Sequence, residues 1–366
     1  MSALIKKIIS PNPISIQGEL RTPPRSKDEM ERDYMDNFDA STMWYDVFSF
    51  ENTVIALGPP LMNQWPKIMK SSIYAGTNIL NRIPEDFEIR GKNKCYWLSI
   101  KSNADKLKLI TSDGEYDIDV SGNETESFRD RRVLLVKSKN NKLNWVKDWV
   151  MHHVKRHKAD AILFYDNQST DYTSEDILEM ISAIDGIHTA IVVKWDFPYG
   201  VNGFATNLWD SDYSQYCILE HARRRFLYNA KSVLSCDIDE LIITENNASI
   251  FEMCENSETG YLKFEGKWIE CCDQNISADN ITHFDHKYIV KNSVCPTKWV
   301  VVPSMCTEDM QWRVHDVSNM IASPSEKITF LHFKCISVSW KYKRTDIRKY
   351  DPEIHSLESQ IQRIIC

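Results

Sequence analysis

The amino-acid sequence predicts an α/β protein with a mostly parallel sheet, preceded by a smaller β-rich domain. From residue 132 onward, apolar strand-like runs alternate with helix-like segments. Residues 40–125 instead contain short β-like runs separated by turn signals, such as Ser-Asp-Gly-Glu at 112–115. Because strands joined by crossover helices pair in parallel, we expect the main sheet in the second part of the chain.

The first third of the sequence divides into an arm and a β-rich region. Residues 1–30 contain four prolines and mixed charges, which predict an N-terminal arm. Residues 31–130 predict a mostly antiparallel accessory domain. The charged stretch ETESFRDRR at 124–132 predicts a joint, so we expect the next domain to begin at residue 131.

The alternating pattern that follows defines each strand and helix. The helix at 143–157 is the clearest, since Leu143, Val146, Trp149, Val150 and Val154 fall on one helical face. The helix at 174–184 begins with a serine that suits an N-cap. The remaining elements are strands at 132–139, 159–167, 188–195 and 231–242, and a helix at 214–230.

Residues 250–345 have a less regular pattern, although they belong to the same expected domain, 131–345. The stretches at 259–270 and 297–305 read as strands. The stretch KITFLHFKCISVSWKYKR at 327–344 is compatible with a strand or a helix and ends in a basic cluster. Residues 346–366 predict a C-terminal amphipathic helix.

Composition and charge exclude several classes of protein. The chain has 366 residues, 42% of them hydrophobic, which allows a substantial core. A net charge of −8 argues against a general nucleic-acid binder. No apolar run reaches membrane-spanning length and the N-terminus lacks a signal peptide, so we expect a cytoplasmic protein. The ten cysteines include no CxxC pair and predict reduced thiols rather than disulfides.

Three acids, Asp237, Asp239 and Glu240, follow a strongly apolar strand. Burying unpaired carboxylates is costly, so a positive partner should meet them. Alternate residues of an extended chain point the same way, which places Asp237 and Asp239 on one side and Ile238 on the other. Two such carboxylates suit Mg²⁺ or Mn²⁺. A solvated turn and an arginine partner are the alternatives.

A second polar group, FYDNQSTD at 164–171, also follows a buried strand directly. In parallel sheets ligands bind beyond the carboxyl ends of the strands, which places Asp166 and Asn167 at a cleft with the acids. A carboxylate there can bind a base N–H or ribose hydroxyls of a nucleotide. The sequence has neither a GxGxxG nor a Walker motif. A plain strand-to-helix loop is the alternative.

The order VLLVKSKNNKLNWVKDWVMHH, ILFYDNQSTD, KWDFPYG, HARRRF and VLSCDIDELI resembles the GT-A glycosyltransferases. The pattern is most similar to glycosyltransferase family 92 and related bacterial enzymes of family 2, and the resemblance covers about residues 130–345. It implies a Rossmann-like sheet with helices on both faces. Two stretches depart from the family pattern, NNK at 140–142 and GKWIECCD at 266–273, which puts the acceptor site in doubt.

The resemblance implies a nucleotide-sugar donor, UDP-linked by preference, and a Mn²⁺ or Mg²⁺ ion bridging its diphosphate. It assigns the metal to Asp237, Asp239 and His332. The basic residues Lys341, Lys343 and Arg344 follow His332 and would cover the diphosphate. The residues expected to bind the nucleotide sugar are Lys137, Asp166, Asn167, Asp171, Asp237 and, from the helix before the acidic strand, Arg224, with Arg225 as its alternative.

Relatives of this type are mostly inverting, so a carboxylate should accept the proton of the acceptor hydroxyl. Asp309 is the expected base, with Glu308 beside it. Glu265 and Glu270, which flank Trp268, are rivals. Aromatic faces suit sugars, and His315 is placed on the acceptor side. The expected acceptor-binding residues are therefore Trp268, His315 and Tyr199, with Trp312 as a further stacking candidate.

Three functional hypotheses follow from these residues. The first is a metal-dependent glycosyltransferase that acts on a glycan acceptor, in surface polysaccharide or other glycan synthesis. The second is a metal-dependent nucleotidyltransferase or phosphohydrolase that uses the same acids. The third is an inactive GT-A protein that binds carbohydrate. Peripheral association with the inner face of a membrane is compatible with all three, and the sequence does not define an oligomeric state.

Overall fold

A computed structural model describes residues 3–80, 87–92, 94–201, 210–337 and 346–358, with side chains for all of these except 87–92. The chain forms two compact units, and each is discontinuous in sequence. Unit 1 contains residues 1–9, 126–194 and 227–366. Unit 2 contains residues 10–125 and 195–226. The basic cluster at 341, 343 and 344 lies outside the described residues.

Unit 2 is built from antiparallel strands, as the short apolar runs predict. One four-stranded sheet has the order β4-β5-β9-β8, another β11-β10-β6-β7, and β2 pairs with β3. The strands are β2 (Ile14–Ser15), β3 (Thr42–Trp44), β4 (Asp46–Phe50), β5 (Thr53–Gly58), β6 (Ser72–Ala75), β7 (Asn78–Leu80), β8 (Phe87–Lys92), β9 (Cys95–Lys101), β10 (Lys106–Ile110) and β11 (Glu115–Asp119).

The helices of unit 2 are short except for one. That helix, α5 (Tyr213–His221), continues into a π-helical turn, η4 (Ala222–Phe226). Together the two form one continuous helix, which confirms most of the helix expected at 214–230, and it belongs to unit 2. The other helices are η1 (Lys27–Glu29), α1 (Tyr34–Asn37), η2 (Met62–Gln64) and α2 (Trp65–Met69).

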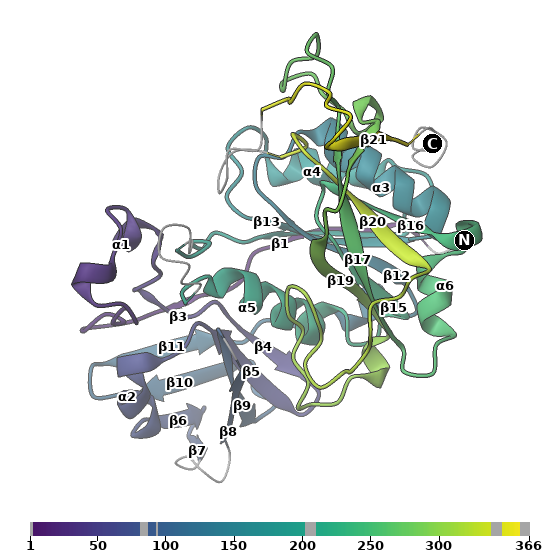
Figure 1. Ribbon diagram of the computed structural model, residues 1–366. Coiled ribbons are helices and arrows are strands. Elements are labelled where there is room, and N and C mark those ends of the chain that lie inside the picture. The colour runs from purple at the N-terminus through teal and green to yellow at the C-terminus, as the bar shows by residue number, and fades with distance from the viewer. Residues whose placement is uncertain (1–2, 81–86, 93, 202–209, 338–345, 359–366) are drawn as a thin grey trace. The chain divides into compact units, whose positions relative to one another are not determined.

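Unit 1 contains a large mixed sheet with the strand order β1-β14-β13-β12-β15-β19-β17-β18-β21, and with β20 bridging β16 and β17 (Figure 1). The first five strands of this order, from β1 through β14, β13 and β12 to β15, pair in parallel. The pairs that follow, from β15–β19 to β18–β21, are antiparallel. The strands are β1 (Ile5–Ile9), β12 (Arg132–Ser138), β13 (Ala161–Asp166), β14 (Thr189–Lys194), β15 (Ser232–Ser235), β16 (Glu240–Thr244), β17 (Tyr261–Glu270), β18 (Tyr288–Val290), β19 (Cys295–Val301), β20 (Ile328–Phe333) and β21 (His355–Leu357).

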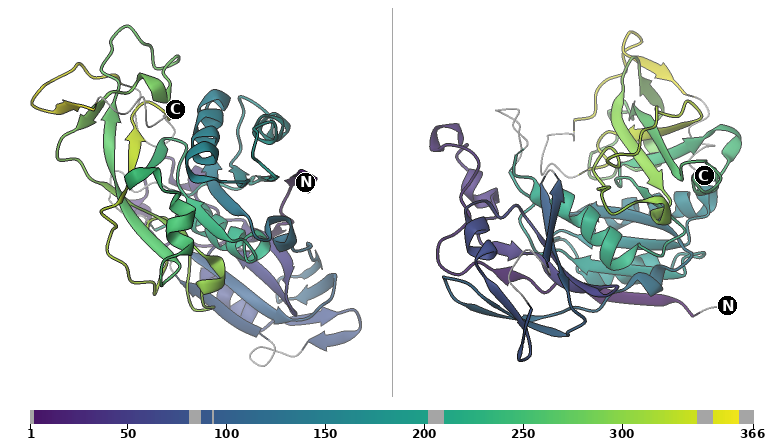
Figure 2. Two further views of the ribbon diagram at one scale, coloured as in Figure 1. Left: turned by 90° about the vertical axis from the view of Figure 1, so that its right-hand side faces the viewer. Right: turned by 90° about the horizontal axis from the view of Figure 1, so that it is seen from below.

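The N-terminal arm is in part a strand of the main sheet. β1 pairs in parallel with β14, and in the right-hand view of Figure 2 it is the purple strand that leads to the N-terminus. Residues 1–9 of the expected arm therefore belong to unit 1, while residues 10–30 belong to unit 2. Together with residues 195–226, this changes the expected division at 30 and 130.

One face of the parallel strands packs on the helices of unit 1. In register across the sheet, Leu134, Ile162 and Ala190 lie side by side, and all three are fully buried. They share one core cluster with Trp149 of α3 and Ile177 of α4. The helices of this unit are α3 (Leu143–His157), α4 (Ser174–Ser182), α6 (Ile250–Glu255), η5 (Glu245–Asn247), η6 (His283–Asp285), η7 (Pro303–Met305) and η3 (Thr125–Phe128), which begins at the unit boundary.

The helix expected at 174–184 is α4, and its N-cap residue lies one position before the expected serine. Thr173, rather than Ser174, is the N-cap: its hydroxyl accepts a hydrogen bond from the amide of Asp176, whose carboxylate in turn accepts one from the Thr173 amide. This reciprocal pair satisfies two backbone donors at the helix start. The sequence resemblance also implies helices on both faces of the sheet, and for the second face this stays a prediction.

Three sequence expectations differ from the structure in unit 1. The run at 231–242 forms two strands, β15 and β16, separated by a turn that contains the acids. Of the run at 327–344, Ile328–Phe333 form a strand, β20, that is almost wholly buried and pairs with β16 and β17; residues 338–344 lie outside the described residues. Residues 346–358 contain the short strand β21 in place of the expected C-terminal helix, since pairing with β18 satisfies their backbone.

Two global expectations concern membranes and thiols. Among the described residues, no helix combines the length and hydrophobicity needed to cross a bilayer. The cysteines among the described residues are free, and most are buried.

Candidate functional site

The three acids lie on a tight turn at the carboxyl end of β15. The amide of Glu240 donates to the Asp237 carbonyl at 3.0 Å, and the amide of Asp237 donates to the Glu240 carboxylate at 2.8 Å. Cys236 and Ile238 are each 2% exposed and anchor the turn in the core. The acids therefore do not interrupt the core strand: they sit where the chain leaves it.

A buried lysine is the first positive partner of these acids. Lys298 of β19 is 5% exposed, and its Nζ lies 2.5 Å from the Asp237 carboxylate and 3.0 Å from that of Glu240. Burial alone would lower the pKa of Lys298, but the two carboxylates raise it above its ordinary value. Lysine was absent from the partners that the sequence suggested, because only the pairing of β15 with β19 brings Lys298 to the turn.

The same partner shifts the two acids in opposite directions. Burial would raise the pKa of Asp237, but Lys298, and to a lesser degree Lys137 and His332, lower it well below its usual range. Burial raises the pKa of Glu240, and the charge of Lys298 only partly offsets this. Half of the Asp237 side chain is exposed, whereas that of Glu240 is buried, so Asp237 is the acid that faces solvent.

A histidine from a distant part of the chain is the second positive partner. β20 places His332 directly opposite Glu240 of β16, and the His332 Nε2 atom lies 3.1 Å from Asp239 Oδ2. Burial opposes protonation, yet Asp239 and Glu240 raise the pKa of His332 to about 10. Trp268 stacks on the imidazole with ring centroids 3.8 Å apart and fixes its plane.

These contacts define a possible metal-ligand set that differs from the predicted one. Ligand atoms of Asp239, Glu240 and His332 all lie within 4.8 Å of one another. The predicted set of Asp237, Asp239 and His332 stays a prediction: Asp237 pairs with Lys298, and Glu240 lies close to the other two residues. Two carboxylates and an imidazole are suitable donors for a divalent ion such as Mn²⁺, provided that the ion displaces the proton that Asp239 and Glu240 favour on His332.

Two of the predicted nucleotide-binding residues, Lys137 and Asp166, lie at the same edge of the sheet as the acidic turn. Register pairs Lys137 with Tyr165 and Ser138 with Asp166, while β12 pairs on its other side with β15. The charge of Lys137 reaches Asp237 and helps to lower its pKa. Strand order thus brings Lys137, Asp166 and the acidic turn to the carboxyl ends of adjacent strands, as expected.

Asp166 and its neighbours organise the loop after β13. The Asp166 carboxylate accepts hydrogen bonds from the Ser169 amide at 3.2 Å and the Ser174 hydroxyl at 2.9 Å. The backbone N–H of the buried Asn167 donates a hydrogen bond to the Ser138 carbonyl at 2.9 Å. Asp171 is exposed, and its amide lies 3.3 Å from the Asn140 side chain. These bonds tie the loops after β12 and β13 together.

Two predicted residues belong to unit 2 instead of unit 1. Arg224 is 2% exposed, donates to Glu220 at 3.2 Å, and stacks its guanidinium over Trp97. Tyr199 donates a hydrogen bond to Gln215. The alternative to Arg224, Arg225, is also buried and pairs with Asp46. Both guanidinium groups are buried and ion-paired with acids of unit 2, and their role in binding a phosphate stays a prediction.

The predicted catalytic acids do not lie together. Glu265 and Trp268 are three residues apart on β17, which places their side chains on opposite faces of the strand. Trp268 faces His332, so Glu265 points away from the acidic turn. Asp309 is exposed and accepts hydrogen bonds from Thr307 and Asn319, and Glu308 beside it is also exposed.

The loop after β19 folds into a hairpin, and only the part that contains His315 lies near Lys298. His315 contacts the Thr297 carbonyl at 3.0 Å, next to Lys298. Desolvation, followed by the charge of Lys298, lowers the pKa of His315. Gln311 pairs with Ser318 and Asp309 with Asn319, so Asp309 lies at the opposite end of this hairpin. The fourth aromatic candidate, Trp312, is fully buried against Trp299.

Part of this chain is similar to several solved structures. No family model matches the sequence, and no curated protein matches it. The matching solved structures include mannosyltransferase Ktr4p from S. cerevisiae with GDP (13% identity, 40% of this chain and 42% of that one). Two others are the bifunctional glycosyltransferase WbbM (15%, 47% and 28%) and the galactosyltransferase LgtC with donor and acceptor sugar analogues (14%, 47% and 58%).

All three likenesses have a TM-score of 0.26, and the chain spans less than two thirds of each of these proteins. A likeness at this level establishes no shared activity. The resemblance to glycosyltransferase family 92 stays a prediction, since no family model matches.

Proposed function

We propose that unit 1 is a metal-dependent glycosyltransferase that moves a sugar from a nucleotide-sugar donor, UDP-linked by preference, to a hydroxyl of a glycan acceptor. The observation that carries this proposal is the meeting of Asp239, Glu240 and His332 at the carboxyl end of β15, beside Lys137. A strand pairing across 93 residues supplies the histidine, and a sequence resemblance had independently assigned that histidine to a metal.

The residues of the turn suit a bound diphosphate. A divalent ion held by Asp239, Glu240 and His332 would compensate the charge that develops on the departing diphosphate. Lys298 neutralises Asp237 and Glu240, so the acids do not repel an anionic donor as three free carboxylates would. Lys137, Asp166 and Asn167 are proposed to bind the nucleoside from the neighbouring strand ends, and Asp171 to close that loop.

The acceptor side is proposed along the exposed rim of the turn. Trp268 offers one aromatic face to His332, and His315 lies beside Lys298. Asp309, with its neighbour Glu308, remains the proposed base of an inverting reaction, although it lies at the opposite end of the hairpin from His315. Glu265 is not proposed, since it points to the other face of β17.

The proposed place of this reaction is surface polysaccharide or glycan synthesis on the cytoplasmic side of a membrane. The acidic turn is equally compatible with a nucleotidyltransferase or phosphohydrolase, and loss of activity would leave a carbohydrate-binding protein. Incubating the full chain with a panel of nucleotide sugars, acceptor glycans and Mn²⁺ distinguishes the three. Free nucleoside diphosphate together with glycosylated acceptor supports the proposal. Pyrophosphate or monophosphate supports the second function, and sugar binding without any product supports the third.

A further inference from the structure

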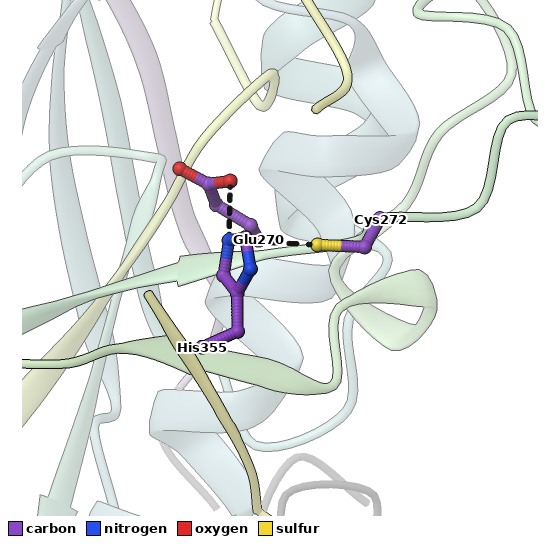
Figure 3. A group of neighbouring side chains, drawn as sticks. All are labelled: Glu270, Cys272 and His355. Atoms are coloured by element: carbon purple, nitrogen blue, oxygen red, sulfur yellow. Dashed lines mark hydrogen bonds and ion pairs between the residues drawn. The ribbon is translucent and has the colours of Figure 1, made fainter. Parts of the chain in front are cut away.

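A second cluster of ligand-type side chains lies outside the acidic turn. Figure 3 shows Glu270, Cys272 and His355 pointing toward one another. Glu270 ends β17, Cys272 follows it, and His355 begins β21. The His355 Nε2 atom lies 3.1 Å from Glu270 Oε2 and 3.7 Å from Cys272 Sγ, and ligand atoms of all three fall within 4.8 Å of one another.

Burial makes this cluster different from a surface group. Glu270 is 3% exposed and His355 is 2% exposed, while Cys272 is partly exposed. Glu270 Oε1 is paired with Lys334, which leaves Oε2 directed at the imidazole. A buried carboxylate is stable only if a positive charge or a strong hydrogen-bond donor lies next to each of its two oxygens.

The backbone around His355 orients its ring for a ligand role. Nδ1 lies 3.0 Å from the Asp351 carbonyl oxygen, to which an Nδ1–H can donate. This bond would leave the lone pair of Nε2 directed between Glu270 and Cys272. Metal-bound histidines commonly donate their second ring N–H to a backbone carbonyl in this way.

The spacing of the three ligand atoms agrees with tetrahedral coordination. Bond lengths of about 2.3 Å for Zn–S, 2.05 Å for Zn–N and 2.1 Å for Zn–O imply S···N and N···O separations of about 3.6 and 3.4 Å. The structure has 3.7 and 3.1 Å for these pairs. They differ from the tetrahedral separations by about 0.1 and 0.3 Å.

We propose that Glu270, Cys272 and His355 form a zinc site, with a fourth position open to water. A sulfur ligand selects zinc over the harder ions Mg²⁺ and Mn²⁺, which prefer oxygen. The site joins the end of β17 to β21, two strands that are separated in the sheet by β18. Zinc would therefore link β21 to β17, the strand that contains Trp268. This proposal is independent of the proposed transferase activity.

The metal-free alternative is a hydrogen-bonded cluster. The amide of Asp351 also lies 3.0 Å from Nδ1, so it can donate to that atom while an Nε2–H donates to Glu270. That arrangement uses the same residues and requires no cation. A direct metal titration distinguishes it from the zinc site.

The test is a titration of the chelator-treated, reduced full chain with Co²⁺, a spectroscopic substitute for zinc. We expect a thiolate-to-cobalt charge-transfer band that saturates at about one equivalent and disappears when Zn²⁺ is added. The ligand set Asp239, Glu240 and His332 contains no sulfur, so metal bound there gives no such band. Zinc at about 100 times its dissociation constant should also raise the melting temperature by roughly 5 °C.

Matched variants identify the ligands. The band and the zinc-dependent rise in melting temperature should be lost in Cys272→Ser and retained in Cys271→Ser, which changes the adjacent buried cysteine. His355→Gln, with its folding checked by circular dichroism, should weaken cobalt binding at least tenfold. Absence of the band in the wild-type chain, or a band of equal size in Cys272→Ser, overturns the proposal. If a variant fails to fold, the cobalt titration of the wild-type chain still tests whether a thiolate binds the metal.

Discussion

Lys298 and His332 each meet the acidic turn through a short contact, and both come from strands far along the chain. Their charges reduce the repulsion among Asp237, Asp239 and Glu240. The negative charges of the turn are therefore compensated by positive side chains before any ligand binds. We expect substitutions at single positions to affect either the stability of the fold or the binding of a metal.

Asp239→Asn should leave the fold intact and lower turnover by roughly 100-fold, because an amide keeps the shape of the carboxylate but loses the charge that binds a cation. Nucleoside diphosphate release with Mn²⁺ measures turnover, and isothermal titration measures Mn²⁺ binding. Asp279→Asn, at a fully exposed side chain of the same unit, is the matched control. Near-normal Mn²⁺ affinity in Asp239→Asn would contradict the metal assignment.

Lys298→Met should destabilise the protein by about 3 kcal/mol, because it leaves the buried Glu240 and the half-exposed Asp237 without their partner. Urea denaturation in EDTA measures the free energy of unfolding. Added Mn²⁺ should recover part of the loss by replacing the missing positive charge. The exposed Lys267→Met on β17 is the control. A variant as stable as the wild type in EDTA would show that the pair contributes little.

At the scale of elements, α3 carries an unusual concentration of buried histidines. His152 and His157 both donate to the Ile242 carbonyl, at 2.8 and 2.9 Å, and His153 packs between them and Trp149. Burial lowers the pKa of His152 to about 3 and that of His157 to about 4, and it holds the pKa of His153 well below 6.5.

Stability should therefore fall as the pH drops below about 6.5. The unfolded chain binds a proton at each histidine near pH 6.5, whereas in the folded chain the pKa is about 3 for His152, about 4 for His157 and well below 6.5 for His153, so acid favours unfolding. Between pH 7.5 and 5.5 each of the three should contribute a loss of roughly 1.3 kcal/mol. His332, whose folded pKa is raised to about 10, contributes about the same amount with the opposite sign.

Urea denaturation at the two pH values checks this expectation. His153→Phe should reduce the pH dependence, while substitution of the exposed His188 by Gln should not. Equal stability at pH 7.5 and 5.5 would mean that the histidines of α3 are protonated in the folded state.

The N-terminal strand is the second element with a testable contribution. β1 covers the edge of β14, and Ile8 packs against the core cluster of unit 1. Deleting residues 1–9 should lower the free energy of unfolding by about 2 kcal/mol, the value for burying one large apolar side chain. Deleting residues 1–4 should have no effect, since β1 begins at Ile5. Equal melting temperatures for the two deletions would contradict a structural role of β1.

At the scale of the whole molecule, the chain passes repeatedly between two compact units, so neither unit is a continuous segment. The residues of the acidic turn, its partners and the loops after β12 and β13 all belong to unit 1. We therefore expect metal binding and donor binding to be properties of unit 1, and the full chain is the appropriate material for testing them.

Removing divalent ions from the full chain should abolish nucleoside diphosphate release. EDTA treatment followed by a donor panel measures this, and excess Mn²⁺ should restore activity in the wild type but not in Asp239→Asn. Mn²⁺ should restore more activity than Mg²⁺, because an imidazole ligand suits Mn²⁺ better than the oxygen-preferring Mg²⁺. Activity that persists in EDTA would exclude a role for the metal.

Sequence alone determined the local elements of unit 1 and the location of the acids. The helical periodicity of 143–157 matches α3 residue for residue, and the apolar runs at 132–139, 159–167 and 188–195 match β12, β13 and β14 within one or two residues. These patterns are local, since each depends on which side chains a single helix or strand can bury. The rule for parallel sheets placed Asp166 and the acidic turn at one edge.

Only the tertiary structure decided which residues meet at that edge. Lys298 pairs with Asp237 because β19 runs antiparallel to β15, and the Glu270, Cys272 and His355 cluster exists because β21 joins the sheet through β18. Such contacts depend on strand register across tens of residues, and one position of slip would turn each side chain to the other face. Composition and spacing carry no record of that register, so partners distant in sequence became visible only with the fold.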